Sequence, residues 1–130
     1  MPFPLAPEFI HVAEQALGAT LPSSYTAAMQ RTNGGELTVN DEVWDQYPIE
    51  DTSDRKRLAR TSNHVIKETQ NLNDWAGFPP GALAIAGNGT GDQLVLIRVG
   101  ETYEDSAYAW SHETSALTKV ANDFAQLLLQ

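Results

Sequence analysis

Residues Leu21-Pro22-Ser23-Ser24-Tyr25 and Arg31-Thr32-Asn33-Gly34-Gly35 mark the start and the end of one helix. The proline fits the first turn, because the backbone N–H that it lacks would have no partner there. Either of the two serines is a candidate to cap the remaining free amides. The Asn-Gly-Gly sequence readily adopts the left-handed conformation that stops a helix. We therefore expect a short helix that ends abruptly and directs the chain into a strand.

Further helical segments are predicted on both sides of this one. Upstream, apolar residues recur with the helical period over residues 9–17, and Gly18 is a candidate stop. Downstream, residues 54–73 predict either one helix or two shorter ones, because polar residues weaken the middle, and Ser53 or Asp54 is the candidate cap. The apolar stripe of this region includes Leu58, Val65, Ile66 and Leu72.

The strand signals lie mainly in the second half of the chain. Glu36–Val39 reads as a short strand, and the segment around Val43-Trp44 as either a strand or an exposed loop. After Pro79-Pro80-Gly81, two apolar strands over residues 83–86 and 94–99 flank a glycine-rich turn. We expect a third strand over Tyr108-Ala109-Trp110 and a closing helix that contains Val120, Phe124, Leu127 and Leu128. These elements predict an α+β fold in which about four helices cover a mainly antiparallel sheet, a hairpin or meander of about four to six strands.

The short motifs keep a recognisable order along the chain. The residues that carry this order are Leu21, Pro22, Tyr25, Asn33, Gly34, Gly35, Gly89, Gly91, Asp92, Trp110 and Phe124. Their order resembles the SUKH superfamily, small α+β domains that include fungal cell-wall assembly regulators of the Smi/Knr type and many bacterial immunity proteins. The resemblance extends over nearly the whole chain and implies a single domain of residues 1–130. It also implies a role in protein binding, either as a toxin antidote or as a regulator.

Composition limits the functions that this chain can have. The 130 residues suit one globular domain, since 42% are hydrophobic and 19% are charged. A net charge of −9 and a pI near 4.5 argue against nucleic acid as a partner, because the phosphate backbone would repel the domain. The absence of cysteine, of a secretory signal and of a bilayer-length apolar run leads us to expect a cytoplasmic protein without membrane contact.

The acidic residues are concentrated in one segment. No Lys or Arg interrupts residues 36–54, after which half of the basic residues arrive together in residues 55–60. This pattern predicts either a docking surface or a loop that pairs with the first turn of the following helix. Trp44 stands among these charges, and we favour a core position for it while keeping it as a possible interface anchor. The candidate partner-binding residues are Asp41, Glu42, Trp44, Asp45, Glu50, Asp51 and Asp54.

Motifs for catalysis, cofactors or metals are not recognised in this sequence. The glycines of residues 87–91 precede a strand instead of a helix, which favours a hairpin turn over a phosphate-binding loop. His112 and Glu113 are adjacent in sequence, and neighbouring residues of a strand point to opposite faces. The histidines lie far apart, and the acidic segment lacks the residue order of a calcium loop. We therefore predict no catalytic residue, no metal site and no cofactor.

Three functions remain in the order in which the sequence favours them. The first is an immunity protein that binds a toxin with a basic surface, such as a nuclease-like toxin, through acidic residues. The second is a regulatory or scaffold protein that binds a cellular partner. The third is a small hydrolase or ligand-binding enzyme, which requires a deep pocket with converging polar groups. The oligomeric state stays open.

Overall fold

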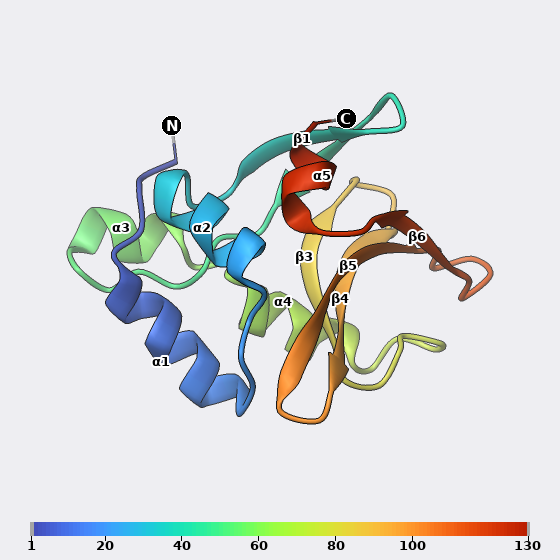
Figure 1. Ribbon diagram of the computed structural model, residues 1–130, viewed down its shortest axis with the longest axis horizontal. Coiled ribbons are helices and arrows are strands. Elements are labelled where there is room, and N and C mark those ends of the chain that lie inside the picture. Colours follow the sequence, from blue (N-terminus) through green and yellow to red (C-terminus); the bar gives the residue numbers. More distant parts are fainter. Residues whose placement is uncertain (1, 130) are drawn as a thin grey trace.

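The computed structural model describes residues 2–129, which build one six-stranded antiparallel sheet with five helices around it (Figure 1). Each strand pairs with the next one along the chain, so the sheet is a meander. The strands are β1 (Gly35–Val39), β2 (Glu42–Gln46), β3 (Ala82–Gly87), β4 (Gln93–Val99), β5 (Thr102–Trp110) and β6 (Leu117–Ala121). The helices are α1 (Pro7–Leu17), α2 (Ser23–Arg31), α3 (Arg55–Arg60), α4 (Val65–Leu72) and α5 (Phe124–Leu128). The predicted α+β class is confirmed.

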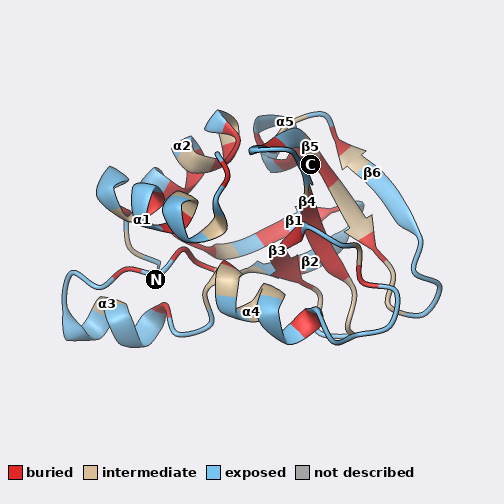
Figure 2. Cartoon of the chain, turned by 90° about the horizontal axis from the view of Figure 1, so that it is seen from below, coloured by how far each residue is buried: buried red, intermediate tan, exposed pale blue. Residues whose placement is uncertain are grey.

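Helices cover both faces of the sheet (Figure 2). Helices α1, α2 and α5 lie on one side, and α4 lies on the other. The side chains of β4 alternate accordingly: Leu94 and Leu96 join the larger core, whereas Val95 packs in a second cluster with Leu72 and Trp110. Strand β4 therefore lies inside the sheet, between β3 and β5, with apolar residues on both of its faces.

The start of α2 differs from the sequence-based expectation. Pro22 is the residue before the first helical turn, and no side chain caps the helix there. Ser24 instead uses its hydroxyl oxygen to accept a hydrogen bond of 3.1 Å from the backbone N–H of Phe124. The aromatic ring of Phe124 meets the buried Tyr25 ring edge-on, with 5.1 Å between the centroids. The predicted serine cap is therefore wrong, because the hydroxyl joins α2 to the C-terminal helix.

The Asn-Gly-Gly stretch follows α2, but the residue directly after the helix is not left-handed. Thr32, the residue after the helix, is extended with φ −149°, and only Gly34 and Gly35 have positive φ, at 109° and 96°. Asn33 is buried, and its side chain exchanges two hydrogen bonds of 2.8 Å with the backbone of Ile49. The asparagine thus connects the end of α2 to the chain beyond β2. By contrast, α1 stops as predicted at Gly18, with φ 69°.

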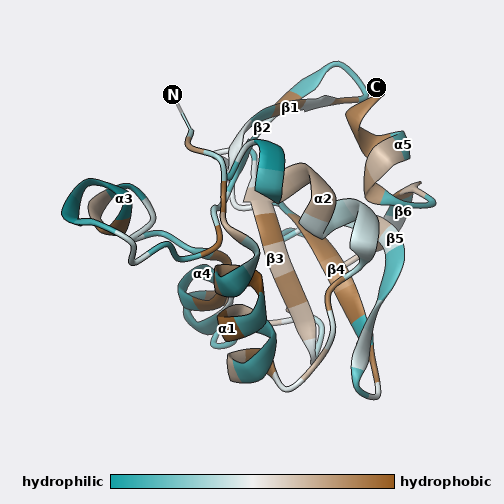
Figure 3. Cartoon of the chain, turned by 60° about the vertical axis from the view of Figure 1, so that its left-hand side comes forward, coloured by the Kyte–Doolittle hydropathy of each residue, from teal (hydrophilic) through white to brown (hydrophobic). Residues whose placement is uncertain are grey.

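The region after the acidic segment forms two helices, one of the two predicted outcomes. Asp54 is the cap of α3, because its carboxylate accepts a hydrogen bond of 2.7 Å from the backbone N–H of Arg57. Leu58 is 46% exposed, so its expected place in the apolar stripe is wrong. Helix α3 lies away from the sheet and is mostly hydrophilic, whereas β3 and β4 are mostly hydrophobic (Figure 3). In α4, Thr69 accepts a hydrogen bond of 2.9 Å from the backbone N–H of Ala84, which fixes this helix to β3.

The C-terminal part contains a strand that the sequence analysis did not predict. Val120 belongs to β6 and not to the closing helix, and Leu128 is 41% exposed instead of docked on the sheet. Phe124 and Leu127 are buried as expected. Trp110 is 0% exposed, and its indole N–H donates a hydrogen bond of 3.1 Å to the carbonyl oxygen of Gly77. Its predicted core position is confirmed.

The glycine-rich segment between β3 and β4 is a hairpin connection, as predicted. Gly89 and Gly91 have positive φ of 85° and 110°. A Cβ added at Gly91 would lie 3.0 Å from the His112 ring, so a side chain there would press on the imidazole. The neighbouring Asp92 makes the contact with His112 that is described below.

Candidate functional site: the acidic hairpin

The acidic segment first forms a β-hairpin with a two-residue turn. Asn40 and Asp41 occupy that turn with positive φ of 52° and 65°, which is the conformation that joins twisted antiparallel strands most readily. The register pairs Leu37 with Trp44 on the face toward the core. Trp44 is 4% exposed, so it is a core residue and the possible role as an interface anchor is wrong for this conformation.

The opposite face of the hairpin is exposed and acidic. Glu36 lies directly opposite Asp45, and Thr38 lies directly opposite Val43, which is 53% exposed. Like charges in directly opposed positions of a sheet repel each other. Within residues 2–129, no ion pair joins Glu36 or Asp45 to a basic side chain. This pair therefore carries uncompensated negative charge.

Two further acidic residues lie at the tip of the hairpin. Asp41 lies exposed at the hairpin turn, and Glu42 follows it at the start of β2. The Glu42 carboxylate accepts a hydrogen bond of 3.0 Å from the side-chain amide of Asn88, in the turn between β3 and β4. The name acidic hairpin is used below for Glu36, Asp41, Glu42 and Asp45.

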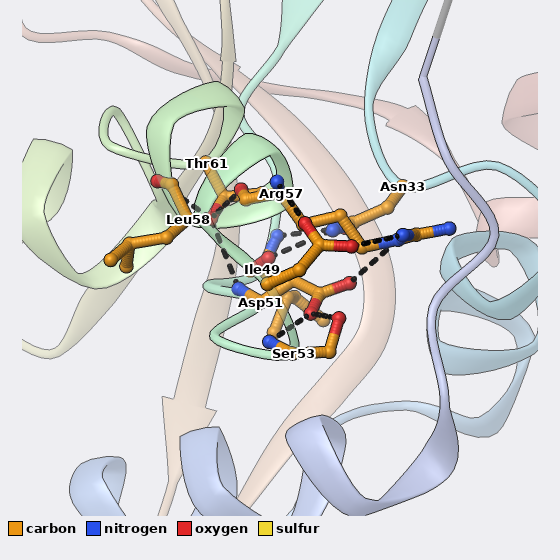
Figure 4. A network of polar contacts seen from close by, with 8 residues as sticks. Asn33, Ile49, Asp51, Ser53, Arg57, Leu58 and Thr61 are labelled. Carbon is orange, nitrogen blue, oxygen red and sulfur yellow. Dashed lines mark hydrogen bonds and ion pairs between the residues drawn. The ribbon is translucent and has the colours of Figure 1, made fainter.

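The second half of the acidic segment forms an internal network instead (Figure 4). Asp51 is buried at 3% exposure, and its carboxylate accepts hydrogen bonds from the backbone N–H and the hydroxyl of Ser53, at 2.9 and 2.6 Å. The backbone N–H of Asp51 donates to the Thr61 hydroxyl over 3.0 Å. The guanidinium of Arg57 lies 3.8 Å from Asp51 and 2.6 Å from Asp54. Asp51 is therefore a structural residue, and we remove it from the candidate surface.

The carboxylates of Asp54 and Glu50 also contact basic side chains of the same chain. Hydrogen bonds from the backbone N–H and then the guanidinium of Arg57 lower the pKa of Asp54. The Glu50 carboxylate lies 3.6 Å from the imidazole of His64. For this half of the segment, the predicted alternative of a loop that pairs with the following helix is confirmed.

The cations of α3 also contact an aromatic ring from the N-terminus. Lys56, Arg57 and Arg60 place their charged groups 5.6, 4.2 and 5.2 Å from the centroid of the Phe3 ring. An open cleft of about 280 Å³ beside them is lined by Phe3, Asn33, Arg57 and Arg60, among other residues. Arg57, which lines this cleft, is paired with Asp54.

His64 and His112 both make hydrogen-bonding contacts within the chain. His64 caps α4 by accepting a hydrogen bond of 3.2 Å from the backbone N–H of Lys67. His112 contacts Asp92 and not its sequence neighbour Glu113, a pairing that no local sequence signal indicated. In the part of the chain from 2 to 129, no group of three or more histidine or carboxylate side chains is arranged to hold a metal ion. None of the helices in this part is both long and apolar enough to cross a bilayer.

Sequence comparison agrees with this fold. The profile of the SMI1 / KNR4 family (SUKH-1) matches residues 4–130, which is almost the whole chain, and the protein belongs to this family. A comparison with individually curated proteins gave no match. The resemblance read from the short motifs is thereby confirmed.

Proposed function

We propose that this protein is an immunity protein that binds and neutralises a toxin with a basic surface, and that the acidic hairpin is its docking face. The observation that carries this proposal is the exposed Glu36–Asp45 pair, in which two carboxylates oppose each other and neither is paired with a basic side chain of residues 2–129. A lysine or arginine from a partner would relieve this repulsion. Membership of the SUKH-1 family favours protein binding as the kind of function.

The distribution of charge across the molecule supports the same surface. Residues 32–54 contain no Lys or Arg, whereas four basic residues lie in α3, on the opposite side of the molecule in Figure 1. A basic partner that approaches by diffusion is attracted to the acidic side and turned away from α3. Exposed charges of this kind act mainly on the association rate and on the choice of partner.

One apolar side chain lies among the acidic residues on the outer face of the hairpin. Val43 is 53% exposed on the same face as Glu36 and Asp45. Protein interfaces commonly combine an apolar centre with a polar rim. The outer face of the hairpin has this arrangement on a small scale.

Growth rescue tests the function directly. We would express the protein beside candidate toxins from its own source and measure growth. Restored growth is expected for an immunity protein, whereas a regulator of the cell-wall assembly type would bind its partner without protecting the cell. Turnover of a small molecule by the purified protein would instead support the enzyme alternative.

A charge-matched pair of variants tests the docking face. The double variant Glu36→Gln/Asp45→Asn should slow association with the toxin by about tenfold at low salt, because steering depends on these charges. The control Glu101→Gln/Glu104→Gln removes the same charge from exposed positions in the β4–β5 turn and at the start of β5. Equal association rates for the two variants would exclude the acidic hairpin as the docking face.

A further inference from the structure

Three loops are linked by contacts near the C-terminal end of β5. They are residues 73–81, 88–92 and 111–116. The hydrogen bond from the Trp110 indole to Gly77 ties the first loop to β5, and the contact of Asp92 with His112 ties the second loop to the third. Asn88, in the second loop, donates to Glu42 of the acidic hairpin. Contacts therefore link the three loops to one another and, through Asn88 and Glu42, to the start of β2.

Trp75 is the exposed tryptophan of these loops. It is 46% exposed, whereas Trp44 and Trp110 are 4% and 0% exposed. Its ring meets the buried Trp110 ring and the His112 ring edge-on, at centroid distances of 6.5 and 6.3 Å. These contacts hold the indole in place while much of it stays open to solvent. A fixed and accessible tryptophan is a common energetic centre of protein interfaces.

His112 presents a hydrogen-bond acceptor beside this indole. The Asp92 carboxylate lies 2.6 Å from Nδ1 of His112 and also accepts a hydrogen bond of 3.1 Å from the backbone N–H of His112. An ionised carboxylate can only accept, so Nδ1 carries the proton, and in the ring form with a single proton Nε2 is the acceptor. Among residues 2–129, no hydrogen bond engages Nε2. An aromatic ring and an acceptor thus stand next to each other.

The charge around Trp75 and His112 is negative. The three loops carry Asp74, Asp92 and Glu113 and contain no Lys or Arg. A planar guanidinium fits these features together, because it stacks on an aromatic ring and donates several hydrogen bonds from its edge. An ammonium group is a compact point charge and uses the ring and the acceptor less well.

We infer that Trp75 and His112 form a binding point for an arginine side chain of the protein partner, with Trp75 as the aromatic anchor. The assignment of the partner as a toxin rests on the function proposed above, whereas the preference for arginine rests on these loops alone. The two ideas can therefore fail separately.

Nuclear magnetic resonance titrations test the arginine preference without the toxin. The full chain is titrated with N-acetyl-arginine amide and, in parallel, with N-acetyl-lysine amide, while the Trp75 indole N–H and the His112 ring signals are followed. We expect binding of the arginine compound to be about two- to fivefold tighter, because the guanidinium stacks on the ring and donates hydrogen bonds from its edge at the same time. Equal binding of the two compounds, or shifts confined to other residues, would overturn the inference.

Variants assign this preference to the two side chains. Trp75→Ala should abolish the difference between the two compounds, and His112→Phe, which keeps an aromatic ring but removes the acceptor, should reduce it. The matched control Glu36→Gln/Asp45→Asn should leave the ratio unchanged, since it alters only the acidic hairpin. A full arginine preference in both Trp75→Ala and His112→Phe would refute the assignment even if either variant were less stable.

Binding to the toxin then tests the anchor in the complex. Trp75→Ala should increase the dissociation rate of a toxin identified by growth rescue by at least about tenfold, as for an interface hot spot. An unchanged dissociation rate would remove Trp75 from the interface. If no toxin is neutralised but the arginine preference is present, the proposed immunity function fails and the arginine site stands.

Discussion

Replacing Asn33 by alanine removes the side chain that joins the end of α2 to the chain after β2. Asn33 is 6% exposed and Ile49 is 0% exposed, so water does not reach the backbone groups of Ile49 in the folded protein. The substitution leaves the backbone N–H and the carbonyl oxygen of Ile49 without the two 2.8 Å hydrogen bonds that satisfy them. Each buried and unsatisfied polar group costs about 1–3 kcal/mol, so the loss of partners for two such groups in Asn33→Ala should lower the free energy of unfolding by about 2–6 kcal/mol.

Urea denaturation measures this loss against a matched variant. Asn71→Ala removes the same side chain from an exposed position, where the amide of Asn71 bonds only to Glu68 at 3.3 Å. That control should change the free energy of unfolding by less than about 0.5 kcal/mol. If Asn33→Ala costs no more than the control, water replaces the lost bonds, and the reasoning from burial at this position is refuted.

Other positions test the core, the loops and the helices in the same way. Trp110→Ala should lower the free energy of unfolding by about 3–5 kcal/mol, because it empties a fully buried site; a nearly neutral result in urea denaturation would contradict the burial of this ring. Burial of Asp92 raises its pKa, but hydrogen bonds from His112 outweigh this effect, and the net pKa is lowered. Asp92 therefore contributes stability that is fully present above its unfolded pKa of about 3.9 and is lost as the pH falls through the folded value; Asp92→Asn should remove this part of the pH dependence, and an unchanged profile between pH 5 and 2 would exclude it. Leu58→Ala should change stability by less than about 0.5 kcal/mol, whereas Val65→Ala should be clearly destabilising, and thermal denaturation of both distinguishes them.

Local signals predicted most of the elements correctly. Alternation and apolar runs gave the central strands β3 and β4, and Gly18 gave the end of α1, because these features depend on backbone conformation within a few residues. The serine cap of α2 was wrong because the hydroxyl of Ser24 bonds to a residue one hundred positions away. Strand β6 was missed because four of its five residues are exposed or only partly buried, which leaves a weak pattern.

For the candidate site too, the sequence predicted one part and the tertiary structure decided the rest. The acidic run is visible in the sequence, but its separation into an exposed hairpin and a buried network around Asp51 follows from contacts with Arg57 and Thr61 in space. The sequence also left open which tryptophan is accessible. Pairing with Leu37 puts Trp44 in the core, and the meeting of three loops leaves Trp75 at the surface.

The sequence by itself determined the fold class, the family and the excess of negative charge, since periodicity, turn residues and composition act locally or on the whole chain. Only the tertiary structure decided which carboxylates stay uncompensated and which aromatic ring is exposed. Those properties depend on distances between segments far apart along the chain, such as Glu42 and Asn88 or Asp92 and His112, and a linear sequence does not contain these distances.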